Sequence, residues 1–243
     1  MDSGGSYREG THLKQAIKSV TSLPVCYVIN THVHPDHMLG NAAFDDEQTI
    51  FIGHEKMPNA MASRLAHYQR QFSEILGSAY NGTEFIGPDQ LVTTSEPTTL
   101  DLGNRSLLLT AYTTAHTDHD LTVLDQKTNT LWTGDLLFRE RIPALDGSIN
   151  GWIAILEKFQ QQSFHAIIPG HGPAAIGAES AVWQPILTYL KTVRTDIREI
   201  IQDMGTIDQA TETVAPNACS NWQLFQHYHR RNVTAAFVEL EWE

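Results

Sequence analysis

The chain has 243 residues, which is enough for one large domain or two small ones. Hydrophobic residues make up 41% of it and charged residues 18%, a balance that is typical of globular proteins and excludes a disordered chain. The 28 acidic residues outnumber the 16 basic ones, and the net charge of −12 argues against nonspecific nucleic-acid binding, since that needs a basic face. No apolar run approaches the roughly 18 residues that span a bilayer, so we expect no membrane partner.

Short β-type runs alternate with amphipathic helices, and we see no repeat or linker that divides the chain. We therefore expect one domain over residues 1–243. A first helix is predicted over 11–20, because apolar residues recur there at helical spacing and should form one buried stripe. The stripe consists of Leu13, Ala16, Ile17 and Val20. Further helices are predicted over 58–76, 152–159, 182–201 and 221–240, and strands over 25–29, 49–52, 98–102, 106–115, 121–125, 130–133 and 165–169.

Residues able to bind metal gather in one loop, directly after the predicted strand that ends at residue 29. His32, His34, Asp36 and His37 lie within six residues, in a chain with twelve histidines. On an extended backbone His32 and His34 point in the same direction, and a kink at Pro35 lets the next residues turn toward a second point. Such a loop can serve two metal ions on the order of 3.5–4 Å apart. The alternative is an exposed histidine-rich loop without a ligand role.

One loop cannot complete two metal sites, because each zinc ion takes three or four N, S or O ligands from the protein. The ends of other predicted strands offer His116, Asp135 and His171. Strand ends are where a rigid sheet presents functional side chains. His119 lies close enough in sequence to mimic a ligand, and we prefer His116 because it comes first after its strand.

In this order, the HxHxDH motif, a distant histidine, a Gly-Asp turn and a final Gly-His resemble the metallo-β-lactamase superfamily. The resemblance runs from Asp2 to about His171 and includes an Asp-Ser-Gly turn, whose aspartate buttresses the metal loop in the family. It implies an α+β fold, an αβ/βα sandwich of two mixed β-sheets flanked by helices. Family strands precede that turn, so we expect an N-terminally truncated domain. Its exposed sheet edge would then be covered by a second copy or a rearranged segment, and Asp2 would lie on a frayed terminus.

The resemblance also assigns the metal ligands. The first metal takes His32, His34 and His116, the second takes Asp36, His37 and His171, and Asp135 bridges both. This all-N/O set suits two Zn²⁺ ions, and iron or manganese fits the same ligands. A hydroxide between the metals would attack an ester-, thioester- or amide-like bond, including a β-lactam, of a small-molecule substrate. Asp36 is the candidate catalytic residue, because it can pass on the proton of the nucleophile.

Other polar residues are candidates for supporting roles. Asp2, Asp118 and Asp120 could orient the ligating imidazoles, with Asp2 favoured by the resemblance and loop solubility as the alternative for the other two. Arg139 and Arg141 could bind a substrate carboxylate, with a solvated loop as the alternative. The loop around His116 departs from the Gly-His-Thr-x-Gly-Ser pattern of many relatives, which argues against carrying over a glyoxalase or lactonase activity.

Residues 32–44, 116–125 and 229–241 resemble a bacterial branch of the superfamily, the zinc metallohydrolases found beside quinoprotein dehydrogenases and sulfur-oxidation systems. Those relatives are exported, which implies a periplasmic location for the full-length protein, although residues 1–6 do not form a signal peptide. Two other classes stay open. A diiron oxidoreductase of this fold typically has glutamate at the position of His34 and carries a flavin domain. A non-catalytic metal-binding protein is the other alternative.

The remaining histidines and cysteines carry weaker signals. His227 and His229 are spaced i, i+2 on a predicted helix, so they do not share a face and we interpret them as surface or packing residues. Cys26 and Cys219 are too few for a disulfide framework, and their separation in sequence says nothing about pairing.

Overall fold

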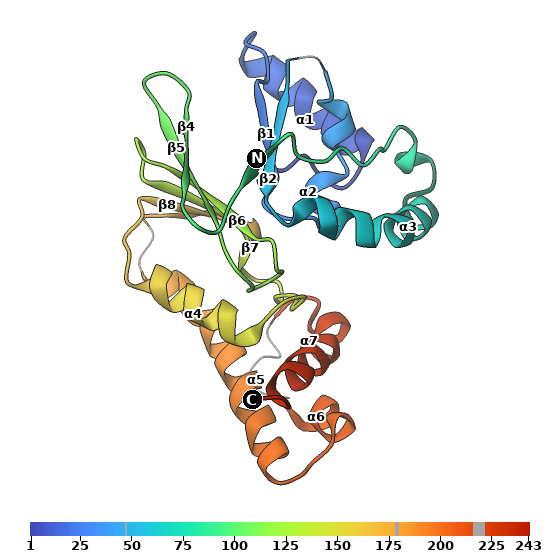
Figure 1. The fold of residues 1–243 in the computed structure, drawn as a ribbon, viewed down its shortest axis with the longest axis vertical. Helices are drawn as coiled ribbons and strands as arrows, with labels where there is room; N and C mark the ends of the chain where they lie inside the picture. Colours follow the sequence, from blue (N-terminus) through green and yellow to red (C-terminus); the bar gives the residue numbers. More distant parts are fainter. Residues whose placement is uncertain (47, 178–179, 216–221) are drawn as a thin grey trace. The chain divides into compact units, whose positions relative to one another are not determined.

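The computed structural model describes residues 1–46, 48–177, 180–215 and 222–243 (Figure 1). The chain divides into two compact units, Met1–Thr98 and Thr99–Glu243. Each unit contains one β-sheet and its own helices, which confirms the predicted α+β class. The expectation of a single domain stays a prediction. No helix of the described residues is long and apolar enough to cross a membrane.

The first unit is built around a small parallel sheet. In chain order it contains α1 (Tyr7–Val20), β1 (Tyr27–Ile29), α2 (Pro35–Met38), a 3₁₀ helix (Asn41–Ala43), β2 (Ile50–His54), α3 (Met57–Leu76), a second 3₁₀ helix (Gly77–Tyr80) and β3 (Gln90–Val92). The strand order is β1-β2-β3, and both strand pairs are parallel. Phe51 of β2 packs with Val28 and Phe44 in a buried apolar cluster. The sheet thereby fixes where β1 ends and the histidine-rich loop begins.

The apolar stripe of α1 is exposed, so the prediction that it is buried is wrong. The helix itself is confirmed and begins earlier, at Tyr7, because the Ser6 hydroxyl accepts a hydrogen bond from the backbone of Glu9 and caps it. Val20 is 83% exposed and Leu13 is 39% exposed. The helix is held instead by its first turns, where Gly10 is its buried residue. Of the stripe, Ile17 is half-buried and packs against the Val28, Phe44 and Phe51 cluster, whereas Leu13, Ala16 and Val20 stay exposed.

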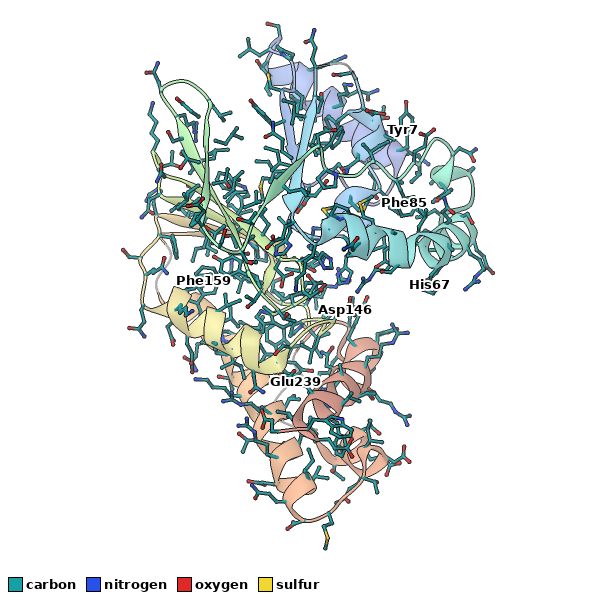
Figure 2. All side chains as sticks on the ribbon, viewed as in Figure 1. Tyr7, His67, Phe85, Asp146, Phe159 and Glu239 are labelled. Atoms are coloured by element: carbon teal, nitrogen blue, oxygen red, sulfur yellow. The ribbon has the colours of Figure 1, made fainter. Side chains whose placement is uncertain are left out.

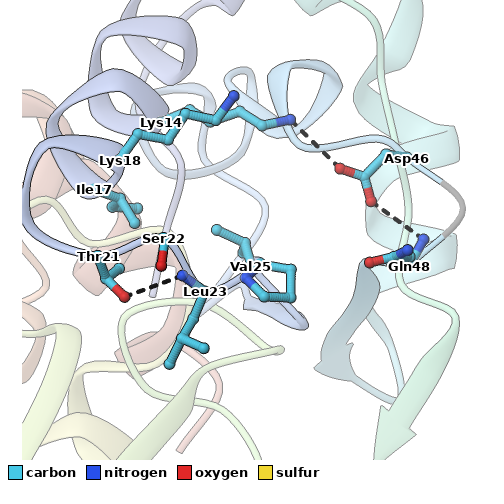
Figure 3. Close-up of a pocket in the computed structure, with 10 residues that line it drawn as sticks. Lys14, Ile17, Lys18, Thr21, Ser22, Leu23, Val25, Asp46 and Gln48 are labelled. Carbon is cyan, nitrogen blue, oxygen red and sulfur yellow. Dashed lines mark hydrogen bonds and ion pairs between the residues drawn. The ribbon is translucent and has the colours of Figure 1, made fainter.

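A hollow lies beside the C-terminal half of α1 and is lined by polar and apolar side chains of the first unit (Figure 3). The Lys14 ammonium lies 3.5 Å from a carboxylate oxygen of Asp46 and donates a 2.9 Å hydrogen bond to the Ala43 carbonyl. The half-buried Ile17 and the exposed Leu23 contribute apolar surface. The exposed stripe therefore continues beyond the helix.

The second unit has a larger, mixed sheet. It contains β4 (Thr98–Asp101), β5 (Ser106–Ala111), β6 (Leu121–Asp125), β7 (Thr130–Phe138), α4 (Ile149–Gln160), β8 (Ala166–His171), β9 (Ala175–Ile176), a 3₁₀ helix (Ser180–Trp183), α5 (Gln184–Gln202), α6 (Ile207–Thr213) and α7 (Phe225–Leu240). The strand order is β4-β5-β6-β7-β8-β9. The pair β7–β8 is parallel, whereas β5–β6, β6–β7 and β8–β9 are antiparallel. Gly103 and Asn104 lie between β4 and β5, with φ of +70° and +50°.

The core of the second unit packs strand β7 against helices α4, α5 and α7. Trp152 of α4 and Trp183 are almost fully buried, and the rings of Phe159 and Trp183 stack with centroids 5.2 Å apart. Figure 2 labels Phe159 on α4. Aromatic side chains bury large apolar areas, so these residues fix the helices against the sheet. Figure 2 also places Glu239, near the end of α7, beside the start of α4.

Most predicted elements are present, with shifted ends. The expected strand over 106–115 is too long, since β5 ends at Ala111. There the Tyr112 amide bonds the Asp120 carbonyl at 2.9 Å, so residues 112–120 close into a loop. The expected strand over 130–133 is too short, since β7 reaches Phe138 through an irregularity near Gly134. The final helix begins at Phe225, and the start of its predicted range, at 221, lies outside the described residues.

Candidate metal centre

The histidine-rich loop of the first unit follows β1 and runs into α2. His34 occupies the position before the first turn of α2, and Pro35 is the first helical residue, where its missing N–H costs nothing. The rings of His32 and His34 have centroids 4.7 Å apart, and those of His32 and His37 lie 4.3 Å apart. A carboxylate oxygen of Asp36 lies 3.6 Å from Nε2 of His37. The four metal-capable side chains of this loop therefore form one local cluster.

Asp2 holds two of these imidazoles in defined tautomers. Its Oδ2 accepts a hydrogen bond from Nδ1 of His37 at 3.0 Å and another from the Thr31 hydroxyl at 3.0 Å. Because that hydroxyl donates to the carboxylate, its oxygen can accept from Nδ1 of His32, which lies 3.0 Å away. Both rings then carry their proton on Nδ1. This leaves Nε2 of each ring with a lone pair for a metal ion.

The amino terminus is held firmly, so the expectation of a frayed Asp2 is wrong. The Asp2 amide donates to the Ile29 carbonyl at 2.9 Å, and its Oδ1 accepts from the Thr31 amide at 2.8 Å. Ser3 donates through its amide to the His37 carbonyl at 2.8 Å. Hydrogen bonds of Asp2 and Ser3 thus link these residues both to β1 and to the metal-capable loop, which gives them a defined position.

The buried side-chain amides of Asn30 and Asn41 also support this loop. Asn41 Nδ2 donates to Asn30 Oδ1 at 2.8 Å, and the Ser3 hydroxyl donates to Asn41 Oδ1 at 2.6 Å. Asn30 Nδ2 donates in turn to the His37 carbonyl at 3.3 Å. These side chains are fully buried, and a buried polar group is tolerated only when it is bonded. The network therefore fixes the loop backbone on both sides of α2.

The second unit brings three of the predicted ligands together. Nε2 of His116 lies 3.5 Å from Oδ2 of Asp135, and Nε2 of His171 lies 3.3 Å from the same oxygen. His116 and Asp135 are buried, whereas His171 is partly exposed. One carboxylate oxygen therefore lies between two imidazole nitrogens. This arrangement suits a carboxylate shared between two metal ions.

Two glycines allow Asp135 to take this position. Asp135 lies inside β7. The predicted strand ends at residue 133, which would have placed Asp135 just past its end. Gly134 has a φ of +51°, which L-residues rarely adopt, and the register of β7 against β8 shifts at this point. A methyl group at Gly170 would lie only 1.9 Å from Oδ1 of Asp135. The bulge turns Asp135 toward His171, and Gly170 leaves space for its carboxylate.

The second nitrogen of His116 bonds a backbone carbonyl. Nδ1 lies 2.6 Å from the Ala144 oxygen, and because a carbonyl only accepts, Nδ1 must carry the proton. Nε2 of His116 is then the nitrogen with the free lone pair, on the side of Asp135. The orienting partner of this ring is thus Ala144, which the sequence did not single out because a backbone carbonyl leaves no side-chain signal.

His171 has a different environment. Its Nδ1 lies 3.1 Å from Nη1 of Arg141, a group that only donates, and its ring packs beside Phe138 with centroids 5.0 Å apart. The Arg141 guanidinium also lies over the ring of Tyr228, 5.8 Å from its centroid. Arg139 donates to the Pro173 carbonyl. Both arginines of the predicted substrate-binding pair are thus bonded within the second unit. Arg141 contacts the imidazole of the candidate ligand His171 through its side chain, whereas Arg139 bonds the His171 carbonyl through its amide.

The loop after His116 is folded around a buried carboxylate. Asp120 accepts from the Thr117 amide at 2.9 Å and from its hydroxyl at 2.6 Å. Burial raises the pKa of Asp120 to about 7, although the bonds from Thr117 act in the opposite direction. Asp118 pairs with Nδ1 of His119 at 2.7 Å. Asp120 therefore shapes the loop that carries His116, and His119 is engaged by its neighbour.

Metal-capable groups among the described residues include all seven predicted ligands. They are His32, His34, Asp36 and His37 in the first unit and His116, Asp135 and His171 in the second. The assignment of each to a metal stays a prediction. Their chemistry fits divalent ions such as Zn²⁺, because imidazole nitrogens and carboxylate oxygens are its usual ligands and three of the rings present Nε2.

The remaining histidines have the predicted roles, and one of the two cysteines lies in the described part of the chain. His229 is buried in α7 and bonds Tyr189 and the Val214 carbonyl, whereas His227 is exposed, as expected for packing and surface residues. Burial lowers the pKa of His229. Cys26 is exposed with a free thiol, and Cys219 lies outside the described residues.

A family model described as the metallo-beta-lactamase superfamily matches residues 1–171. The chain belongs to this superfamily. The match includes every predicted metal ligand, from His32 to His171, and it spans parts of both compact units. The bacterial branch is suggested by residues 32–44, 116–125 and 229–241, and the last of these stretches lies outside the matched region. Membership of that branch stays a hypothesis.

Solved metallo-beta-lactamase structures resemble this chain at low identity. A metallo-beta-lactamase from Pontibacter korlensis is 20% identical and superposes with a TM-score of 0.60 over 77% of this chain and 80% of that one. A metallo beta lactamase from Hirschia baltica is 15% identical, with a TM-score of 0.58 over 78% of each chain. The stereoselective inverting sec-alkylsulfatase Pisa1 from Pseudomonas sp. is 12% identical, with a TM-score of 0.76 over 98% of this chain but 45% of that one. At these identities the likeness shows the fold alone.

Proposed function

We propose that this protein is a metal-dependent hydrolase that binds two divalent ions, with Zn²⁺ favoured, through the seven predicted ligands. Its substrate would be a small molecule with an ester-, thioester- or amide-like bond, including a β-lactam. The observation that carries the proposal is the position of Asp135, whose Oδ2 lies within 3.5 Å of Nε2 of both His116 and His171. Superfamily membership supports the same reading.

The orientation of the imidazoles is the second support. His32, His37 and His116 each have Nδ1 engaged, by Thr31, by Asp2 and by the Ala144 carbonyl. A histidine held in this way presents Nε2, and the bond on its other nitrogen raises its basicity as a ligand. Surface histidines without a ligand role would not need such partners. The arrangement therefore favours metal binding over a merely histidine-rich surface.

Bound divalent ions would supply Lewis acidity and would lower the pKa of water toward neutrality. The chain itself would contribute orientation and proton transfer. Asp36 has a side chain that is 51% exposed and lies at the start of α2, so its carboxylate can exchange protons with solvent. We assign it the role of accepting and passing on a proton of the reacting water. His116 and Asp135 are buried and act as fixed ligands.

A sulfate ester is the second candidate substrate. The observation that favours it is the structural likeness to the sec-alkylsulfatase, which extends over 98% of this chain. Arg141 lies beside His171 and offers a guanidinium, the group best suited to bind a sulfate or carboxylate through two hydrogen bonds. Because the fold does not determine the substrate, the two classes must be separated by assay.

Metal analysis combined with a substrate panel tests the proposal. Purified protein loaded with Zn²⁺, Mn²⁺ or Fe²⁺ is analysed for metal and assayed with a chromogenic cephalosporin, a thioester and a secondary alkyl sulfate. We expect about two Zn²⁺ per chain and turnover of one of the three substrates, and we expect both to be lost in His116→Ala. His227→Ala, which removes an exposed histidine, is the matched control and should change neither.

The alternatives predict other results. Iron together with oxygen consumption would support a diiron oxidoreductase. Two metals without any turnover would support a non-catalytic metal-binding protein. Loss of metal in His227→Ala equal to that in His116→Ala would contradict the ligand assignment.

A further inference from the structure

Helix α7 carries two buried or half-buried polar residues that face the loop before α4. We define residues 143–150, this loop together with the first two residues of α4, as the docking loop. Asn232 and Glu239 are seven residues apart, which places them on the same side of a helix after two turns. Both bond the docking loop, and neither belongs to the predicted ligand set. Their contacts therefore need an explanation of their own.

Asn232 fixes the first part of the docking loop. Its Nδ2 donates to the Pro143 carbonyl at 2.7 Å, and its Oδ1 accepts from the Leu145 amide at 2.9 Å. These two bonds flank Ala144 on both sides. Nδ2 also donates to the Tyr189 hydroxyl at 2.9 Å, so the buried amide is well satisfied. The backbone of Ala144 is thereby held from a helix that lies almost ninety residues further along the chain.

Glu239 fixes the second part of the docking loop. Its carboxylate accepts from the Ser148 hydroxyl at 2.7 Å, from the Ile149 amide at 2.7 Å and from the Asn150 amide at 3.3 Å. These groups form the first turn of α4, where backbone N–H groups lack partners within the helix and a negative charge is favourable. The carboxylate thus anchors the start of α4 to α7.

The docking loop in turn holds His116. The Ala144 carbonyl accepts from Nδ1 of the ring at 2.6 Å, and the Asp146 amide donates to the His116 carbonyl at 2.9 Å. The Ser148 amide donates to the Ala115 carbonyl at 2.8 Å. A methyl group at Gly147 would come within 2.5 Å of that same carbonyl, so the two backbones are in close contact. Ring and backbone of His116 are both fixed by this one loop.

We propose that Asn232 and Glu239 are positioning residues for His116, which act through the docking loop to keep its Nδ1 protonated and its Nε2 available. This inference rests on the proposed function only in treating His116 as a metal ligand. Hydrogen bonds link α7 to the docking loop, the loop backbone leads to Ala144, and a further hydrogen bond links the Ala144 carbonyl to the ring. Supporting residues of this kind typically contribute about 10- to 100-fold to metal affinity.

The test reads the tautomer of His116 directly in the metal-free protein. Protein labelled with ¹⁵N-histidine is examined by NMR at pH 8, and His116→Gln identifies the signal of His116. We expect the Nδ1–H tautomer in the unchanged protein and a growing share of the Nε2–H form in Asn232→Ala and Glu239→Gln. Thr234→Ala, at an exposed position of α7 whose hydroxyl bonds only its own helix, is the matched control and should show no change.

A second measurement gives the consequence for metal. Zn²⁺ affinity, measured by competition with a chelator, should fall about 10- to 100-fold in both variants and remain unchanged in Thr234→Ala. Thermal unfolding shows whether each variant is folded, and Glu239→Gln, which keeps the shape of the side chain, decides the matter if Asn232→Ala does not fold. Folded variants with an unchanged His116 tautomer overturn the inference. Failure of the unchanged protein to bind Zn²⁺ would overturn the proposed function instead, since the NMR measurement needs no metal.

Discussion

Asp2 accepts a hydrogen bond from Nδ1 of His37 at 3.0 Å, so the second residue of the chain fixes the ring of a predicted metal ligand. The same carboxylate bonds both the hydroxyl and the amide of Thr31. It therefore acts on the loop at two points, one before and one after the HxH motif. A residue at a terminus seldom has such a role, because termini are the least ordered parts of most domains.

Replacement of Asp2 should change the free energy of metal binding more than it changes the free energy of unfolding. Asp2→Asn keeps the size of the side chain but loses the negative charge that three donors share. We expect Zn²⁺ affinity to fall about 10- to 100-fold, measured by competition with a chelator. Asp45→Asn, at an exposed position, is the control and should leave the affinity unchanged. Equal affinities for Asp2→Asn and the unchanged protein would show that the loop is held without this carboxylate.

Gly170 should be intolerant of any side chain, because a Cβ there would meet Oδ1 of Asp135 at 1.9 Å and the backbone of Gly134 at 2.7 Å. Gly170→Ala must therefore displace the Asp135 carboxylate or part β7 from β8. We expect fewer bound metal ions per chain together with a lower melting temperature. Gly87→Ala is the matched control, since a Cβ there makes only ordinary contacts with Met61. Full metal content in Gly170→Ala would mean that Asp135 is not the shared ligand.

The sequence predicts the metal-capable loop well because its residues are neighbours in the chain. His32, His34 and His37 follow a buried strand, and their spacing alone indicates a ligand cluster. Asp135 and His171 are found only through the order of motifs along the chain. The bulge at Gly134 that directs Asp135 depends on the register between two strands, which the sequence does not specify locally.

Other features of the site carry little or no sequence signal. Ala144 acts through its backbone carbonyl, so its residue type says nothing about its role. Asn232 could have been noticed, because it interrupts an apolar face of α7 on which Val233 and Ala236 are buried. The prediction that the stripe of α1 is buried is wrong because periodicity identifies an apolar face and cannot show what covers it. Neighbours far apart in sequence decide each of these cases.

The exposed face of α1 predicts self-association. Val20 and Leu23 are 83% and 74% exposed, and both lie in the segment of the chain that leads from α1 to β1. Large exposed apolar side chains that lie near one another in the chain favour contact with a second copy. We expect a concentration-dependent increase in size by light scattering, abolished in Val20→Lys. Val238→Lys, at an exposed apolar position of α7, is the control. A monomer at all concentrations that binds no hydrophobic dye would contradict this expectation.

Asp125 should contribute to the stability of the second unit, and this contribution should be lost at acidic pH. Its carboxylate lies at the end of β6 and bonds the Arg105 guanidinium, the Thr128 hydroxyl and the Lys127 amide. The bond from Arg105 is the largest cause that lowers the pKa of Asp125 from 3.8 to about 2. Because the folded pKa is the lower one, the stabilisation is complete above about 3.8 and is lost as the pH falls through about 2.

Asp125→Asn should therefore lower the free energy of unfolding at pH 7, and the difference from the unchanged protein should shrink below about pH 4. Urea unfolding at a series of pH values measures both quantities. Asp45→Asn, which removes an exposed carboxylate, should give no such pH-dependent difference. A gap that stays constant down to pH 3 would mean that Asp125 contributes through its shape and neutral hydrogen bonds rather than through its charge. In that case the ion pair with Arg105 would add nothing measurable, as is common for pairs with one exposed partner.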